Sequence, residues 1–95
     1  MKFVINNLKY DTSHMKLISD KCKYSYQAIL FGTFVQYSGK NVKLWVSKKD
    51  NWLLTYEDHL YCNRGVALSK REVEQYLLKY DLDVYEKEFG PLEEA

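Results

Sequence analysis

Two histidines and two cysteines are the side chains of this sequence with the chemistry to bind zinc. Zinc ligands usually come as two tight pairs, each separated by a few residues. His59 and Cys62 form one such pair, but His14 and Cys22 are eight residues apart, which is a weak pattern for a second pair. The spacing therefore favours ordinary loop and core residues at these positions, and we expect neither a metal ion nor a cofactor.

Other signatures of catalysis are equally weak. Glu57 and Asp58 are adjacent carboxylates with the chemistry for general acid–base work, but such a pair in a loop of a small protein is usually solvated. Neither histidine stands in a catalytic sequence pattern. No phosphate-binding glycine loop is formed, because the glycines are scattered at positions 32, 39, 65 and 90. We therefore expect that the protein is not an enzyme.

Length and composition predict one folded domain. In a chain of 95 residues, a second hydrophobic core would leave each half below the size that usually folds unaided. Hydrophobic residues make up 46% of the chain and aromatic residues 16%, more than a disordered chain carries. The start of the chain turns polar after Ile5, there is no apolar run of about 18 residues, and two cysteines are too few for a disulfide framework. These features predict a soluble cytoplasmic protein that does not enter a membrane.

Strand-forming residues dominate the first part of the chain. Segments rich in β-branched and aromatic residues predict strands at 2–6, 15–19, 27–37, 42–47 and 52–56, with a break near 11–14. Gly32, inside the longest of these segments, predicts a bulge or a close backbone approach. Residues 57–67 show no clear period and are predicted to form a connecting loop.

The hairpin of residues 42–56 has one clearly apolar face. Alternation assigns this face to the core, with Val42, Leu44, Val46, Trp52, Leu54 and Tyr56. Trp45 and Leu53 fall on the opposite face, which is either covered in part by another element or exposed as a contact surface. Asp50 and Asn51 tolerate the left-handed conformation of a tight turn, so folding alone explains the charged residues at this tip.

A helical period begins after residue 68. Ser69 and Glu72 form a capping box, which satisfies free amide groups at a helix start. Apolar residues then recur at helical spacing, at Val73, Tyr76, Leu77 and Tyr80. This pattern predicts an amphipathic helix of about three turns.

A second, shorter helix is predicted to start at the capping pair Asp83 and Glu86 and to end at Gly90-Pro91. The predicted fold is therefore α+β, with an antiparallel β-meander of four to five strands and two C-terminal helices on one face. The chain is predicted to be a single domain, 1–95, with strands mainly in 1–57, helices mainly in 69–89 and a tail at 90–95.

Charge is uneven along the chain although the formal net charge is +1. Up to Tyr56, nine lysines face three aspartates, whereas five basic residues face ten acids from Glu57 onward. The first part mixes lysines with aromatic residues, as single-strand nucleic-acid binders do. These residues are Lys16, Lys21, Lys23, Lys40, Lys43, Lys48 and Lys49 with Tyr24, Tyr26, Tyr37 and Trp45. Because lysine also commonly protects strand edges, nucleic-acid binding through this basic aromatic region is kept as the alternative function.

Tyrosine is unusually frequent, with nine in the chain. So many cannot all be interior in a protein of this size, and exposed tyrosine is favoured at protein contacts. The acidic residues of the C-terminal part have the charge to complement a basic groove on a partner, or else they form an ordinary polar helix and tail. These observations favour a protein–protein interaction.

Four sequence blocks follow one another along the chain: LKYDTSHMKLI, LWVSKKDNWLL, ALSKREVEQYL and YEKEFGPLEEA. Together they extend over nearly the whole chain, and their order resembles a loose group of small proteins carried by phages and integrative elements of Firmicutes. The chain departs from that group in two places. Asp50 stands where the hairpin turn of the group usually has glycine, and AILFGTFVQYSG is an added strand-like run.

The resemblance implies a mobile-element accessory protein, and some proteins of this kind act as anti-CRISPR inhibitors. No catalytic residues carry over, because the shared motifs are structural. We therefore predict a non-enzymatic phage or mobile-element protein, in the cytoplasm of a bacterial host, that binds and inhibits a host defence protein, with a CRISPR effector nuclease as the expected target. The predicted partner-binding residues are Lys48, Lys49, Asp50, Asn51, Trp52, Asp81, Asp83, Glu86, Glu88, Glu93 and Glu94. A homodimer stays open, because the edge strand 2–6 is able to pair with a second copy.

Overall fold

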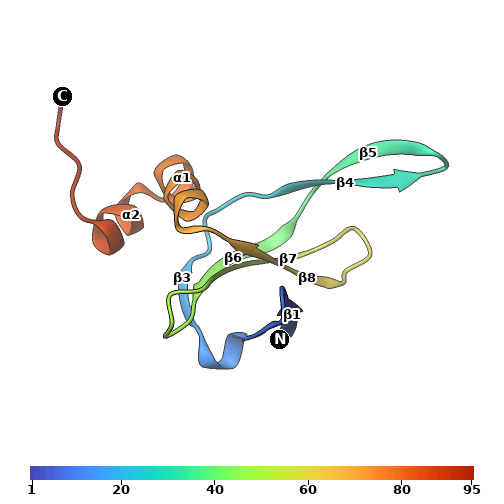
Figure 1. Cartoon of the computed structure of the whole chain (residues 1–95). Coiled ribbons are helices and arrows are strands. Elements are labelled where there is room, and N and C mark those ends of the chain that lie inside the picture. Colours follow the sequence, from blue (N-terminus) through green and yellow to red (C-terminus); the bar gives the residue numbers. More distant parts are fainter.

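The computed structural model describes all residues, 1–95, and has the predicted α+β class (Figure 1). Strands fill the first two thirds of the chain and two helices follow, which confirms the predicted order of elements. The strands are β1 (Lys2–Ile5), β2 (Leu8–Asp11), β3 (Lys16–Ser19), β4 (Ser25–Leu30), β5 (Thr33–Ser38), β6 (Lys40–Val46), β7 (Trp52–Glu57) and β8 (Asn63–Leu68). The helices are α1 (Lys70–Tyr80) and α2 (Leu82–Phe89), and a 3₁₀ turn spans Thr12–His14.

The strands form three antiparallel sheets. The main sheet has four strands in the order β3-β6-β7-β8, while β1 pairs with β2 and β4 pairs with β5 as separate two-stranded ribbons. Consecutive strands β6, β7 and β8 make the meander, and β3 adds to its edge beside β6. Figure 1 shows the β4–β5 ribbon extending away from this sheet, which contributes to principal extents of 48 × 33 × 20 Å.

The prediction of one long strand at 27–37 was wrong. Residues on either side of Phe31-Gly32 pair with one another, with Leu30 opposite Thr33 and Tyr26 opposite Tyr37. Phe31 and Gly32 both have positive φ, at 50° and 77°, as the type I′ turn of a two-residue hairpin requires. Glycine therefore marks a reversal of the chain here and not a bulge.

The prediction of a loop over 57–67 was also wrong for its second half. Residues 63–68 form β8, which is antiparallel to β7. Leu68 lies opposite Trp52 at one end of the pair, and Asn63 lies opposite Glu57 at the other. The turn between the strands is organised by Asp58, whose carboxylate accepts hydrogen bonds from the backbone amides of Leu60 and Cys62, each at 2.9 Å. Because a side chain satisfies these amides, the turn forms without a glycine that would have marked it in the sequence.

The core lies between one face of the main sheet and the helices. Leu44 and Leu54 of the sheet and Val73 and Leu77 of α1 are fully buried. The alternation predicted for the 42–56 hairpin is confirmed, since all six residues assigned to the core face belong to this cluster or pack against it. Helix α1 is therefore held to the sheet by the apolar stripe that its 3.6-residue period predicted.

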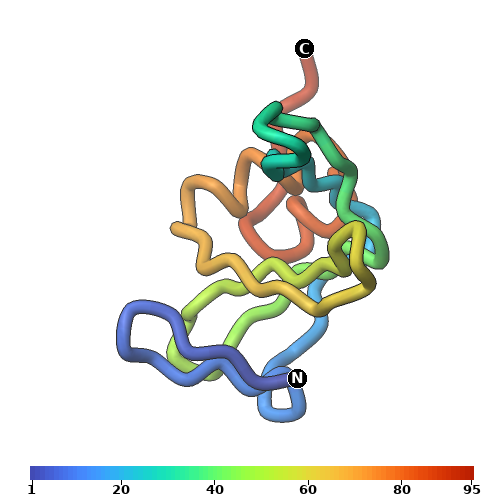
Figure 2. The backbone as a smooth tube through the Cα atoms, turned by 90° about the vertical axis from the view of Figure 1, so that its right-hand side faces the viewer, coloured from blue at the N-terminus to red at the C-terminus, as the bar shows by residue number.

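The opposite face of the sheet is covered by the β1–β2 ribbon, which Figure 2 shows running alongside the sheet strands. Leu53 is fully buried on this face, and the ring of Phe3 lies so close to Gly65 that a Cβ atom there would be 2.9 Å from it. Trp45 is half-buried and donates a hydrogen bond from Nε1 to Thr55 Oγ1 at 2.9 Å. The first alternative for this face, coverage by another element, is therefore the correct one.

The helix starts confirm one capping prediction and correct the other. Ser69 and Glu72 form the predicted capping box, with bonds of 3.2 Å to Ser69 Oγ and 3.0 Å to Glu72 Oε1. The second helix begins at Leu82, earlier than the Asp83–Glu86 pair predicted, and it has no side-chain cap. Gly90, with φ of 101°, ends the second helix as predicted.

None of the helices has the length and the apolar composition needed to cross a lipid bilayer.

Candidate functional site

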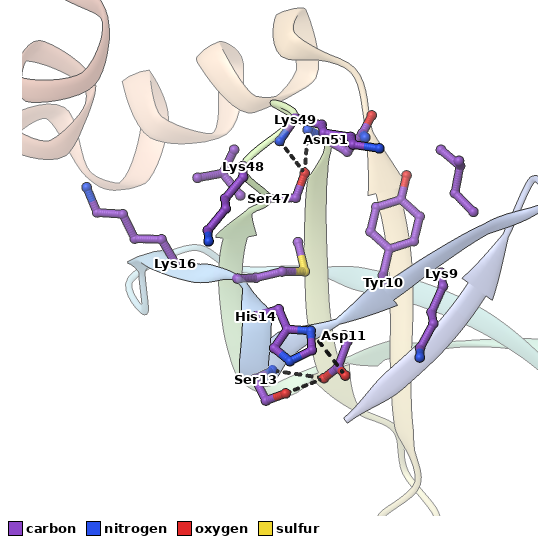
Figure 3. Close-up of a pocket in the computed structure, with 13 residues that line it drawn as sticks. Lys9, Tyr10, Asp11, Ser13, His14, Lys16, Ser47, Lys48, Lys49 and Asn51 are labelled. Atoms are coloured by element: carbon purple, nitrogen blue, oxygen red, sulfur yellow. Dashed lines mark hydrogen bonds and ion pairs between the residues drawn. The ribbon is translucent and has the colours of Figure 1, made fainter.

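A hollow of about 1150 Å³ lies between the β1–β2 ribbon, the 3₁₀ turn and the β6–β7 turn (Figure 3). Five charged residues line it, and four of them are basic. They are Lys9, Lys16, Lys48 and Lys49, with Asp11 as the acid. We call this hollow the basic groove.

The charges of the basic groove are largely uncompensated. Lys9, Lys48 and Lys49 have no carboxylate within ion-pair distance, and Lys16 reaches out of the groove toward the helices, where its ammonium is 3.8 Å from Glu88 (Figure 3). Asp11 is directed to its own turn: its carboxylate accepts hydrogen bonds from the Ser13 hydroxyl at 2.7 Å and the Ser13 amide at 3.1 Å. The hydrogen bond from the Ser13 hydroxyl is the main cause that lowers the pKa of Asp11 below its ordinary value.

The β6–β7 turn holds two of the lysines at the rim of the groove. Ser47 Oγ accepts hydrogen bonds from the backbone amides of Lys49 at 3.3 Å and Asn51 at 3.1 Å, and the Asp50 amide donates to the Ser47 carbonyl. Asp50 has φ of 61°, the left-handed conformation that the sequence predicted at this tip. This is a three-residue loop with one left-handed position, a common hairpin connection.

Four of the five predicted contact residues of this tip reach the surface. Lys48, Lys49 and Asp50 are exposed and Asn51 is half-buried. Trp52 is different, because only 8% of its surface is exposed. The centroid of its ring system lies 6.0 Å from the centroid of the Phe89 ring. Trp52 falls on the core face by strand alternation, so its predicted role as a contact residue is corrected to a role in the core.

The predicted acidic residues of the C-terminal part do not form one surface. Asp81 is 6% exposed and accepts a hydrogen bond of 2.6 Å from Ser19 Oγ, so it joins α2 to the end of β3 and is not available to a partner. Glu86 accepts a hydrogen bond from the Leu92 amide at 3.1 Å, and Glu88 faces Lys16. The remaining predicted acids are exposed, at Asp83, Glu93 and Glu94.

The β4–β5 ribbon carries a second candidate surface, which the sequence prediction missed. Its end, which we call the apolar tip, consists of Ile29, Leu30, Phe31 and Phe34. Phe31 is 99% exposed, and Ile29 and Phe34, which face one another across the ribbon, are each 68% exposed. No charged residue occurs anywhere in 24–39. The uncharged run and the Phe-Gly pair within it were the signals that could have identified this tip.

The base of this ribbon is fixed to the β7–β8 turn. The Tyr26 hydroxyl accepts a hydrogen bond from the His59 amide at 2.6 Å and lies 3.0 Å from the Nδ1 atom of the same residue. Tyr37 stacks on the His59 ring, with centroids 4.1 Å apart and planes 9° from parallel, and Tyr26 packs against Tyr56 with centroids 5.1 Å apart. We call these four residues the aromatic base, and they connect the ribbon to the main sheet.

The aromatic base bears on the nucleic-acid alternative. Tyr26 and Tyr37 were expected to be stacking platforms for unpaired bases, but both are half-buried and packed against other rings. Trp45 is also half-buried on the sheet face and bonded to Thr55. The aromatic residues of this alternative are therefore used mainly within the protein.

The four residues considered as zinc ligands do not gather. Cys22 is buried in the core, Cys62 is exposed on the β7–β8 turn, and His59 belongs to the aromatic base. No group of three or more histidine, cysteine, aspartate or glutamate side chains has the arrangement of a metal site.

Comparisons of the chain with protein-family models, curated proteins and solved structures gave no match. The two candidate surfaces of this small α+β protein are thus defined by its own residues, and the resemblance to mobile-element proteins stays a prediction.

Proposed function

We propose that this protein acts by binding and not by turnover: it is a mobile-element protein that binds and inhibits a host defence protein, with a CRISPR effector nuclease as the expected target. The observation that carries the proposal is the apolar tip, held away from the body of the protein by the anchored β4–β5 ribbon.

Exposure of the apolar tip has no explanation in folding. A large aromatic side chain contributes to stability only when it is buried, and Phe31 is almost completely exposed. Grouped apolar side chains on the surface of a small protein usually mark an interaction site, and aromatic residues frequently dominate the binding energy of such sites. Anchoring by Tyr26 and Tyr37 lowers the entropy lost on binding, because the ribbon is already oriented.

We expect the apolar tip to bind in an apolar pocket of a different protein. The main hollows on a second copy of this chain are the basic groove and a smaller hollow of about 440 Å³, in which Lys23, Glu72 and Lys79 take part. Most of the residues that line these two hollows are polar or charged, so neither is an apolar pocket of the kind that buries a phenylalanine. A partner pocket of the kind that buries aromatic anchors fits the tip better than self-association does.

The resemblance supplies the class of target. The tip lies within AILFGTFVQYSG, the run by which this chain departs from the group it resembles. In this proposal the shared elements build the scaffold and the added ribbon selects the defence protein. A projecting ribbon that enters a pocket of an effector nuclease inhibits it by blocking a domain movement, without any chemistry.

The proposal is tested by measuring binding to purified CRISPR effector nucleases by biolayer interferometry and inhibition of their target cleavage. We expect the double variant Phe31→Ser and Phe34→Ser to bind more than about tenfold more weakly and to lose inhibition in proportion. The matched control is Val4→Ser with Leu60→Ser, which removes two apolar side chains of similar exposure, 79% and 67%, from other parts of the surface.

Retention of the full affinity by the tip variant, or an equal loss in the control, would overturn the assignment of the tip. Absence of binding to every effector nuclease tested would overturn the assignment of the target.

A further inference from the structure

We infer that the basic groove is a second binding site, which takes the phosphate backbone of a double-stranded nucleic acid. This inference does not depend on the proposed function, because the groove and the apolar tip share no residue. Figure 1 shows the β6–β7 turn, which forms one wall of the groove, and the β4–β5 ribbon at opposite ends of the molecule, so both sites can be occupied together.

Charge is the first argument for this site. Three ammonium groups, those of Lys9, Lys48 and Lys49, lie around one hollow without a carboxylate partner. Asp11 offsets only part of this charge, because it is one carboxylate among four lysines and makes no ion pair with any of them. Like charges held near one another repel, and a polyanion relieves that repulsion while releasing its own counterions.

The type of basic residue is the second argument. Lysine acts as a point charge and is a common phosphate ligand, whereas arginine adds paired hydrogen bonds to a carboxylate or a phosphate. Every basic residue of the groove except His14 is a lysine, and no arginine lines it. The groove therefore suits a polyanion that is bound by charge, and a duplex, with its dense rows of phosphates, gains from such binding because it releases condensed counterions.

The arrangement of aromatic residues is the third argument, and it favours paired over unpaired strands. Binding of single strands uses exposed aromatic faces on which bases stack. Tyr10 is the one tyrosine, phenylalanine or tryptophan of the groove and is only 7% exposed, and the imidazole of His14 lies 3.7 Å from the Asp11 carboxylate. The groove thus lacks an extended stacking surface, and we expect its lysines to contact mainly the phosphates of a duplex, with little sequence preference.

Rigid walls make the site preformed. The Ser47 hydroxyl fixes the turn that carries Lys48 and Lys49, and the left-handed pair Asn6-Asn7, with φ of 52° and 63°, closes the ribbon that carries Lys9. The lysine backbones are consequently held in place before the ligand arrives, although their side chains remain free to adjust to successive phosphates.

The test uses a fluorescently labelled 20-base-pair DNA duplex of arbitrary sequence and measures anisotropy between roughly 50 and 200 mM salt. We expect the wild-type protein to bind at low salt and the triple variant Lys9→Gln, Lys48→Gln and Lys49→Gln to bind more than about tenfold more weakly. The slope of log affinity against log salt should decrease in magnitude by about 2 to 3, since each lost phosphate contact removes roughly 0.9. The matched control is Lys70→Gln, Lys79→Gln and Lys87→Gln, which makes the same change of net charge at exposed lysines of the two helices, outside the groove.

Three results would overturn the inference: no binding of the duplex at roughly 50 mM salt, an equal loss in both triple variants, or tighter binding of a poly-glutamate competitor than of the duplex. Absence of binding would mean that the groove is not a nucleic-acid site. An equal loss in both variants would mean that only the net charge of the protein matters, and preference for poly-glutamate would mean that the ligand is an acidic protein. The tip variant, Phe31→Ser with Phe34→Ser, should still bind the duplex, which separates failure of this site from failure of the apolar tip.

Discussion

Two consecutive hairpins of this protein use similar residues in opposite ways. β4–β5 and β6–β7 are both antiparallel, both rich in aromatic and branched residues, and separated in the chain by Gly39 alone. In β6–β7, Leu44 and Leu54 are completely buried and the turn carries lysines. In β4–β5 the apolar residues are at the exposed end and no charge occurs in the ribbon.

The difference shows which residues have a folding role and which do not. The arrangement of β6–β7 follows from folding, because its apolar face makes the core and its charged turn keeps the end soluble. The same reasoning does not explain β4–β5, whose exposed phenylalanines stabilise nothing in the isolated protein. The end of β4–β5 is therefore a candidate contact surface, while the turn of β6–β7 adds two lysines to the basic groove.

The largest expected effect is a difference in stability between a variant of the β6–β7 hairpin and a variant of the β4–β5 hairpin. Leu54→Ala in β7 should lower the free energy of unfolding by about 2–5 kcal/mol, because it removes a fully buried side chain and leaves a cavity. Phe34→Ala in β5 removes a larger side chain and should change it by no more than about 0.5 kcal/mol, as is usual for exposed positions. Urea unfolding followed by tryptophan fluorescence measures both. Comparable losses in the two variants would show that the ribbon packs more tightly than its exposure indicates.

A smaller effect should appear at low pH in the turn that anchors the ribbon. The Cys62 backbone amide, followed by the guanidinium of Arg64 at 2.9 Å and the Leu60 amide, lowers the pKa of Asp58. A carboxylate with a lowered pKa in the folded protein contributes stability that is complete above its unfolded pKa of about 3.9 and is lost as the pH falls through the lower folded value.

Asp58→Asn should therefore be less stable than the wild type at neutral pH, and the difference should shrink below about pH 4. Urea unfolding at a series of pH values measures this convergence. Parallel stability curves down to about pH 3 would mean that the charge of Asp58 does not hold the turn.

The fold was predictable wherever local signals and burial agree. Alternation in 42–56 identified the core face, and the period after Ser69 identified the first helix, because each pattern records one buried face over many residues. The second capping pair failed for a tertiary reason. Asp81, which precedes α2, is hydrogen-bonded to Ser19, a residue 62 positions earlier in the chain, and no local pattern contains that contact.

The candidate surfaces were predictable only in part. Lys48 and Lys49 were identified because the turn that exposes them is local. Their grouping with Lys9 depends on how the β1–β2 ribbon lies against the sheet, which the sequence does not express. The apolar tip was missed because Phe31-Gly32 lies in a run of strand-forming residues, where the period does not distinguish one strand from two.

The smallest expected effect concerns Phe31 in the turn of β4–β5. The β1–β2 ribbon has a turn of the same kind and serves as the reference. Asn6-Asn7 closes β1–β2 with two positive φ angles, and asparagine tolerates that conformation, whereas a phenylalanine at φ of 50° is strained by about 1 kcal/mol or more. Phe31→Asn creates an Asn-Gly turn, which should stabilise the β4–β5 ribbon by about 1 kcal/mol and slow amide hydrogen exchange in its strands by about fivefold.

The control Phe34→Asn makes the same chemical change at a strand position, where asparagine is disfavoured, so exchange in the ribbon should become faster. Binding of the proposed partner, a defence protein, should weaken in both variants, because each removes an aromatic residue of the apolar tip. A gain of stability together with a loss of binding in Phe31→Asn would indicate that the strained phenylalanine is kept for contact with a partner, since Asn-Gly is the more favourable turn sequence. Unchanged binding by Phe31→Asn, with slower exchange, would instead assign contact to the sides of the ribbon and leave its end without a role.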